Sequence, residues 1–139
     1  MPITKATQNV TTGLLPTSGG TVTGEVLFGI PAETKATPAI SAGALTLNLS
    51  TATLFYVSLG QNITSLSFSN PPASPKVFSF TLQFVADGVQ RTVAWPAAVK
   101  WSFGSAPTPT SALNKIDTFT FLTHDGGTSW FGFVSGQNF

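Results

Sequence analysis

Large apolar residues alternate one by one with polar residues along residues 78–84, and this alternation constrains the fold more than any other feature of the chain. The apolar positions are Phe78, Phe80, Leu82 and Phe84. The positions between them are Ser79, Thr81 and Gln83. Successive side chains of a β-strand point to opposite faces of its sheet. The segment therefore predicts a strand in the centre of a sheet, with one side on the core.

Further strands or short extended elements, bounded by Gly, Pro, Asn and Asp, are predicted in the rest of residues 45–139. These are residues 45–49, 54–59, 63–68, 91–95, 97–101, 116–123 and 129–134. Asp87-Gly88 predicts a hairpin turn between 78–84 and 91–95, and Asp125-Gly126-Gly127 predicts another between the last two segments. No window favours a helix longer than about one turn. The pattern predicts an all-β fold for residues 45–139, an antiparallel β-sandwich that is jelly-roll-like or immunoglobulin-like.

Residues 1–44 have no sustained period. Glycine and proline interrupt them every few residues, which excludes a helix or a long strand. Apolar residues recur too often for a free disordered tail, so we expect an extended, irregular N-terminal arm that lies on another protein surface, such as a second subunit. A glycine-rich turn is the alternative for its most distinctive part. The candidate contact residues are Gly19, Gly20, Thr21, Val22, Thr23, Gly24, Leu27 and Phe28.

Charge is scarce in this chain. Charged residues make up 8% of it, against roughly 25% in an ordinary soluble domain, and the net charge is +1. The basic residues are scattered singly and form no stripe that could neutralise a run of phosphates, which argues against nucleic-acid binding. Low net charge also weakens repulsion between copies, so an oligomer or a place in a lattice and a modestly soluble monomer are equally compatible with the composition.

Several classes of site and of location are not predicted. The chain contains no cysteine, which excludes disulfides and thiolate metal sites. No secretory signal and no membrane-spanning apolar run can be recognised, so we expect no membrane partner and assembly in the cytoplasm where the protein is made.

Catalytic chemistry is not indicated either. His124 stands beside Asp125 in a turn, and Thr128 or Ser129 would have to serve as its nucleophile, but turn formation explains these residues better. The carboxylates show no pairing typical of a glycosidase and no calcium-binding cluster. No glycine cluster precedes a helix, as a phosphate-binding loop requires. We therefore predict no enzymatic activity, no catalytic residue, no metal and no cofactor.

Aromatic residues are the remaining candidates for a binding surface. Trp130 and Phe131 are neighbours in a predicted strand and must point to opposite faces, so at least one of them is a candidate for an exposed contact. Phe139 ends the chain and is predicted to be buried in the core or against a partner. The tryptophans could stack on sugar rings, or they could be core and subunit-contact residues, which is the preferred interpretation.

Several sequence blocks in residues 44–139 resemble a β-domain of tailed-bacteriophage structural proteins, which occurs at the C-terminal ends of tail fibres and as small stand-alone virion proteins. The most specific blocks are Trp95-Pro96-Ala97-Ala98-Val99-Lys100-Trp101 and Asp125-Gly126-Gly127-Thr128-Ser129-Trp130-Phe131-Gly132-Phe133. In addition, Ser18-Gly19-Gly20-Thr21-Val22-Thr23-Gly24 is similar to an element of trimeric tail-fibre shafts and collars. The domain so identified offers no catalytic residues.

The resemblance implies a virion structural protein, and the short arm favours a trimeric capsid decoration (cement) protein on the virion exterior. Its expected partners are two further copies of itself and the major capsid protein or another virion protein. The alternative is a short tail fibre or receptor-binding tip that recognises a host surface glycan. A polysaccharide-degrading enzyme whose carboxylates meet only between subunits is a third reading.

Overall fold

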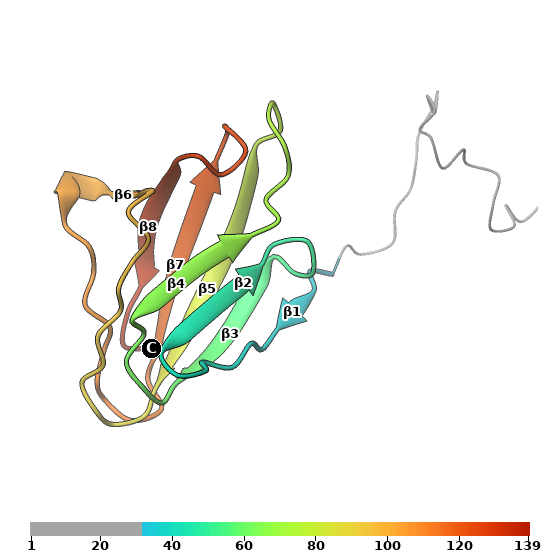
Figure 1. Cartoon of the computed structure of the whole chain (residues 1–139). Coiled ribbons are helices and arrows are strands. Elements are labelled where there is room, and N and C mark those ends of the chain that lie inside the picture. The colour runs from blue at the N-terminus through green and yellow to red at the C-terminus, as the bar shows by residue number, and fades with distance from the viewer. Residues whose placement is uncertain (1–31) are drawn as a thin grey trace, which may run out of the picture. The chain divides into compact units, whose positions relative to one another are not determined.

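Two β-sheets packed face to face form the part of the chain that the computed structural model describes, residues 32–139 (Figure 1). These residues make up one compact unit. The predicted contact residues of the arm, 19–24, 27 and 28, lie outside the described residues, and their role stays a prediction. The prediction of an all-β fold is confirmed.

The larger sheet has six strands in the order β1-β3-β5-β7-β8-β6. In that order they are β1 (Lys35–Ala36), β3 (Leu54–Leu59), β5 (Phe78–Ala86), β7 (Ile116–Thr123), β8 (Trp130–Gly136) and β6 (Val99–Trp101). The smaller sheet pairs β2 (Ala44–Asn48) with β4 (Ser65–Ser69), and both lie across one face of the larger sheet (Figure 1). A single 3₁₀ turn, η1 (Ser102–Gly104), follows β6.

The first five strands alternate between the two sheets. As a result β3 lies parallel to β1, β5 lies parallel to β3, and β4 lies parallel to β2. Strand β6 is also parallel to β8, and only the β5–β7 and β7–β8 pairs are antiparallel. The prediction of antiparallel pairing throughout is therefore wrong. Parallel neighbours need a crossover, and among β1 to β5 a strand of the opposite sheet supplies it, so the short loops look like those of hairpins.

Residues 91–95 do not form the predicted hairpin partner of β5, whose two neighbours are β3 and β7. The chain instead crosses to Ile63, whose N–H donates to the carbonyl of Thr92 and whose carbonyl accepts from the N–H of Ala94. Arg91 binds the carboxylate of Asp87 through Nε at 3.1 Å and holds the turn that starts this departure. The Asp-Gly signal thus marks a turn, but not a hairpin.

The sheet domain begins earlier than the predicted boundary at residue 44. Lys35 and Ala36 pair with the first two residues of β3, and the carbonyl of Ile40 accepts a hydrogen bond from the side chain of Gln61. Ile40 also packs against the buried core. Residues 32–44 are therefore part of the domain, although Pro38 and Gly43 hid the short strand within them.

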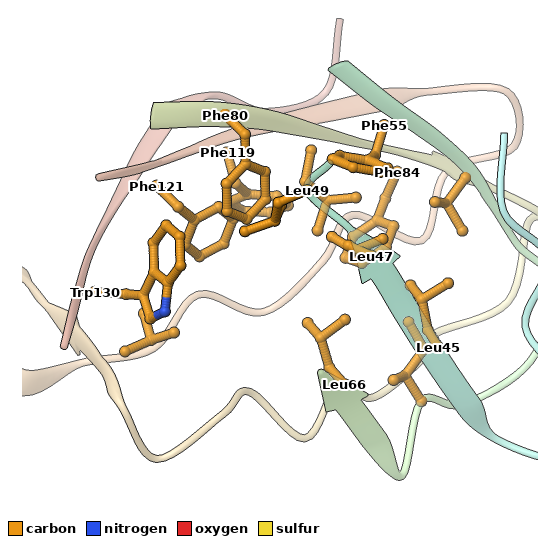
Figure 2. Close-up of a cluster of buried hydrophobic side chains, with 14 of the residues drawn as sticks. Leu45, Leu47, Leu49, Phe55, Leu66, Phe80, Phe84, Phe119, Phe121 and Trp130 are labelled. Carbon is orange, nitrogen blue, oxygen red and sulfur yellow. The ribbon is translucent and has the colours of Figure 1, made fainter. Parts of the chain in front are cut away.

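The core lies between the two sheets and is largely aromatic on the side of the larger sheet (Figure 2). Phe80 of β5 is its hub, with ring centroids 5.0 Å from Phe68 and Phe121, 5.4 Å from Trp130 and 5.8 Å from Phe55. The smaller sheet contributes the leucines that face these rings: Leu45, Leu47 and Leu66. The alternation that predicted a central strand with one buried side is confirmed.

Replacing Phe80 by Ala is expected to reduce the free energy of unfolding by about 3–5 kcal/mol, because it removes a buried ring and leaves a cavity among four aromatic neighbours. Phe133→Ala is the matched control, since Phe133 is exposed on the opposite face of the larger sheet. Urea unfolding of both variants measures the difference. Losses of similar size would contradict the assignment of Phe80 as the hub of the core.

Candidate functional site

The carboxylate of Asp117 is buried and holds the C-terminus in place. It accepts hydrogen bonds from the N–H of Thr110 at 2.6 Å, the N–H of Asn138 at 3.0 Å and Nε2 of Gln137 at 3.2 Å. These donors come from the loop before β7 and from the segment after β8. Asp117 therefore stabilises the fold and does not face an open cleft.

Asp125 organises the turn between β7 and β8 in the same way. Its carboxylate accepts from the N–H of Ser129 at 3.0 Å and from the hydroxyl of Thr123 at 2.9 Å. The hydrogen bond from Ser129 is the main reason why the pKa of Asp125 lies below its ordinary value, and loss of solvation opposes this effect. The neighbouring ring of His124 stacks on Phe131 with centroids 5.8 Å apart.

The other described acidic residues also form local contacts. Asp87 is paired with Arg91, which lowers the pKa of this carboxyl, and Glu33 accepts a hydrogen bond from Thr53 at 3.0 Å. Within residues 32–139, no three His, Cys, Asp or Glu side chains come together as a metal site. The same part of the chain has no helix that is both long and apolar enough to cross a membrane.

The tryptophans pack inward: Trp95 and Trp101 lie against the phenylalanines of β7, and Trp130 lies against Phe68 of β4. The rings of Trp95 and Trp101 meet edge to face at 5.0 Å, and Trp101 also lies against Gly132, where a side chain would collide with it. Nε1 of Trp95 donates to the carbonyl of Pro107, and Nε1 of Trp130 donates to that of Gly127. This packing agrees with the preferred interpretation of the tryptophans as core residues.

The three aromatic residues predicted as candidate contacts, Trp130, Phe131 and Phe139, differ in how exposed their side chains are. Trp130 is only 2% exposed, so its prediction as a surface contact is wrong: its alternate position in β8 points to the core. Phe131 is half-buried on the opposite face. Phe139 is 66% exposed, so burial in the core is also wrong, because Asn138 turns the chain and only the backbone of Phe139 bonds to Ile116. Burial against a partner stays a prediction.

The outward face of the larger sheet is the most extensive candidate surface. We define it as the side chains that alternate with the buried ones along β3, β5, β7 and β8. None of them is buried. They are Leu54, Tyr56, Ser58, Ser79, Thr81, Gln83, Val85, Ile116, Thr118, Thr120, Leu122, Phe131, Phe133 and Ser135.

No charged side chain stands on the outward face along these four strands. Charge enters only on the two edge strands, where the ammonium groups of Lys35 and Lys100 lie 5.3 Å from the ring of Tyr56 and 5.9 Å from that of Phe131. Four polar side chains of the face hydrogen-bond to one another in pairs. The hydroxyls of Thr120 and Ser135 lie 2.8 Å apart, and the amide of Gln83 donates to the hydroxyl of Thr118 at 3.2 Å. A partner can cover such a face without removing an ion from water.

Sequence reasoning passed over this face, although the polar half of the alternation in residues 78–84 already indicated it. Ser79, Thr81 and Gln83 are polar but uncharged, as are Thr118 and Thr120 in β7. Polar residues on an exposed strand face are ordinarily interspersed with charges. The complete lack of charged residues at these positions could have been noticed from the sequence, before the strand order was known.

Comparison of the chain with protein families, with curated proteins and with solved structures returned no match. The resemblance to bacteriophage virion proteins therefore stays a prediction.

The hydrogen bonds from Gln137 and Asn138 to Asp117, here called the C-terminal clamp, give one test. Deleting residues 137–139 removes two of the three donors to this buried carboxylate, and we expect the free energy of unfolding to fall by about 1–3 kcal/mol for each group left unsatisfied. Deleting Phe139 alone keeps both donors and is the control. Unchanged thermal stability of the longer deletion would rule out the clamp.

The turn carboxylate gives a second test, which depends on pH. Because the folded pKa of Asp125 is lowered, its contribution to stability is complete above the ordinary value of 3.8 and is lost as the pH falls through the folded pKa. Asp125→Asn should therefore lower the melting temperature at about pH 6 and make little difference at about pH 2. Thr128→Ala removes a hydrogen bond to the backbone of the same turn, and its effect should not change with pH. A pH-independent effect of Asp125→Asn would contradict this role.

Proposed function

We propose that this protein is a non-enzymatic virion structural protein of a tailed bacteriophage, a trimeric decoration protein on the exterior of the capsid. The uncharged outward face of the larger sheet is the observation that carries the proposal. The described carboxylates lie apart in local structural contacts, and His124, beside Asp125, stacks on Phe131, which favours binding over catalysis. The phage assignment depends on the sequence blocks around Trp95–Trp101 and Asp125–Phe133.

The symmetry of the oligomer limits what the outward face of the larger sheet can bind. A patch that packs face to face on its own copy makes a twofold contact, and such a contact closes a dimer. A threefold ring instead needs two different patches that meet head to tail. A trimer closed by two other patches leaves the outward face free to bind another protein, and we assign it to the major capsid protein. Several copies per trimer then bind together, and their affinities combine through avidity.

The face suits a binding surface of this kind. Four of its polar side chains, Gln83, Thr118, Thr120 and Ser135, already bond to one another in pairs, so covering them leaves these groups with partners. Half-buried Leu122, Phe131 and Ile116 add apolar area that is removed from water on contact. A partner with a similarly uncharged surface would bind with weak dependence on salt.

A short tail fibre or receptor-binding tip is the second candidate, and Phe103 is the observation that favours it. Its side chain is completely exposed, and its backbone has a φ of 55°, which a bulky residue rarely adopts. Its chain neighbour Ser102 helps to line a hollow of about 330 Å³, together with Trp101 and Phe133. An exposed aromatic next to a hollow is suited to stacking on a sugar ring.

Copy number separates the two candidates. Quantitative gels of purified virions should show the protein in hundreds of copies, in proportion to the major capsid protein, and particles that lack it should burst at a lower temperature. A few copies per virion, together with inhibition of adsorption by host glycans, would overturn the decoration role in favour of the tip.

The outward face is tested by a charge placed at its centre. We expect Thr120→Arg to weaken binding to particles that lack the protein by at least about ten-fold, because the guanidinium must lose its water on contact. Thr46→Arg is the matched control: Thr46 is a strand threonine of the smaller sheet that also pairs with a serine hydroxyl, Ser67, at 3.0 Å. Sedimentation of protein with particles measures both variants. Equal binding of the two would show that the outward face is not the contact.

A further inference from the structure

The edge of β3 is open over most of its length. Strand β1 pairs with it only at Lys35↔Leu54 and Ala36↔Phe55, while β3 continues to Leu59. Backbone groups of a strand point alternately to its two neighbours. Since the N–H of Leu54 points toward β1 and donates to the carbonyl of Thr34, the N–H of Ser58 points to the same side. Among residues 32–139, no strand pairs with β3 there.

A groove accompanies this open edge. It has a volume of about 440 Å³ and a mainly apolar lining, and it lies where the chain leaves β1 and crosses to the smaller sheet. Pro38, Ala39 and Ile40 form one side, and Tyr56 and Ser58 of β3 form another. An extended segment that paired with Ser58 could place an apolar side chain in this groove. Sheet edges of this kind bind extended peptides by main-chain hydrogen bonds, with adjacent pockets giving specificity.

We propose that the open edge of β3 binds the segment Gly24–Ile30 of a second copy of this chain as an added strand. The segment contains Val26, Leu27 and Phe28, which favour extended structure, and a single charge, that of Glu25. Lys35 is the described charge nearest in sequence to the groove and is opposite in sign to Glu25. The segment ends two residues before Ala32, and at about 3.3 Å per residue its first residue can lie no farther than roughly 26 Å from Ala32, so the second copy must pack directly beside the start of β1.

This contact rests on the trimer of the proposed function and supplies the interface that the trimer needs. Arm and edge are different patches, so they meet head to tail, and three such contacts close a ring. Of the outward face, only Tyr56 and Ser58 at its β3 edge take part in them. The arm then links the copies of one trimer, while the sheet face binds the capsid.

Cysteine cross-linking of the full-length chain tests the contact directly, because the protein has no cysteine of its own. One chain carries Ser58→Cys, and a second chain, tagged to differ in mass, carries a cysteine in place of Val26, Leu27 or Phe28 in turn. After the two are mixed and mildly oxidised, a disulfide-linked species with one chain of each kind is expected for at least one arm position. Ser79→Cys, on the outward face away from the edge, is the control and should give at least ten-fold less cross-linked product.

Two further variants connect the contact to the oligomeric state. Ser58→Pro removes the N–H donor at the edge, whereas Ser58→Ala keeps it. Light scattering should show a trimer for Ser58→Ala and a monomer for Ser58→Pro. Leu27→Asp changes only the arm and should also give a monomer, which guards against misfolding of the proline variant.

The outcomes are distinct. The absence of a mixed disulfide-linked species at every arm position, cross-linking equal to that of the control, or an unchanged trimer in both Ser58→Pro and Leu27→Asp would overturn the proposal. None of these measurements involves a virion. A trimer linked through its arms that is present in few copies on purified particles would support this inference and refute the decoration role alone.

Discussion

The stacking of Phe80 against Phe121, its neighbour across β5 and β7, is the interaction on which the rest of the structure depends. The two rings lie 5.0 Å apart on the inward face of the larger sheet, and Phe68 of the smaller sheet contacts both. This contact joins the parallel half of the larger sheet to its antiparallel half and joins both halves to the second layer. A chain with so few charges must obtain its stability from such apolar burial.

The inward and outward faces of the larger sheet have different roles: the first forms the core and the second forms a surface. Every second residue of β5 and β7 fills the core, and the residues between them form an uncharged surface. Because a shift of one residue would exchange the two faces, the aromatic core also fixes which side chains the surface presents. The proposed capsid contact is therefore a direct consequence of the core packing. The proposed arm contact depends on a different feature, the early end of β1 at Ala36.

Local patterns in the sequence predicted the strands well, because side-chain alternation is a property of single strands. The alternation along β5 and the Asp125-Gly126-Gly127 turn between β7 and β8 were sufficient to locate these elements. The order of the strands in the sheets could not be predicted from these local patterns. Asp87-Gly88 fits a hairpin, yet the following residues cross to Ile63, and only long-range packing decides between the two paths. Trp130 was misassigned for a related reason: alternation separates it from Phe131 but does not say which of the two faces the core.

Strands β1 to β5 wind between the layers like successive turns of a coil, and this winding has a consequence for how the domain can evolve. A further turn would add one strand to each layer beside β1 and β2 without altering the aromatic pairs at the other end. The β1 side is thus the edge at which insertions can add strands to both sheets. The opposite end is terminated by the three residues of β6 and the turn at Ser102–Gly104.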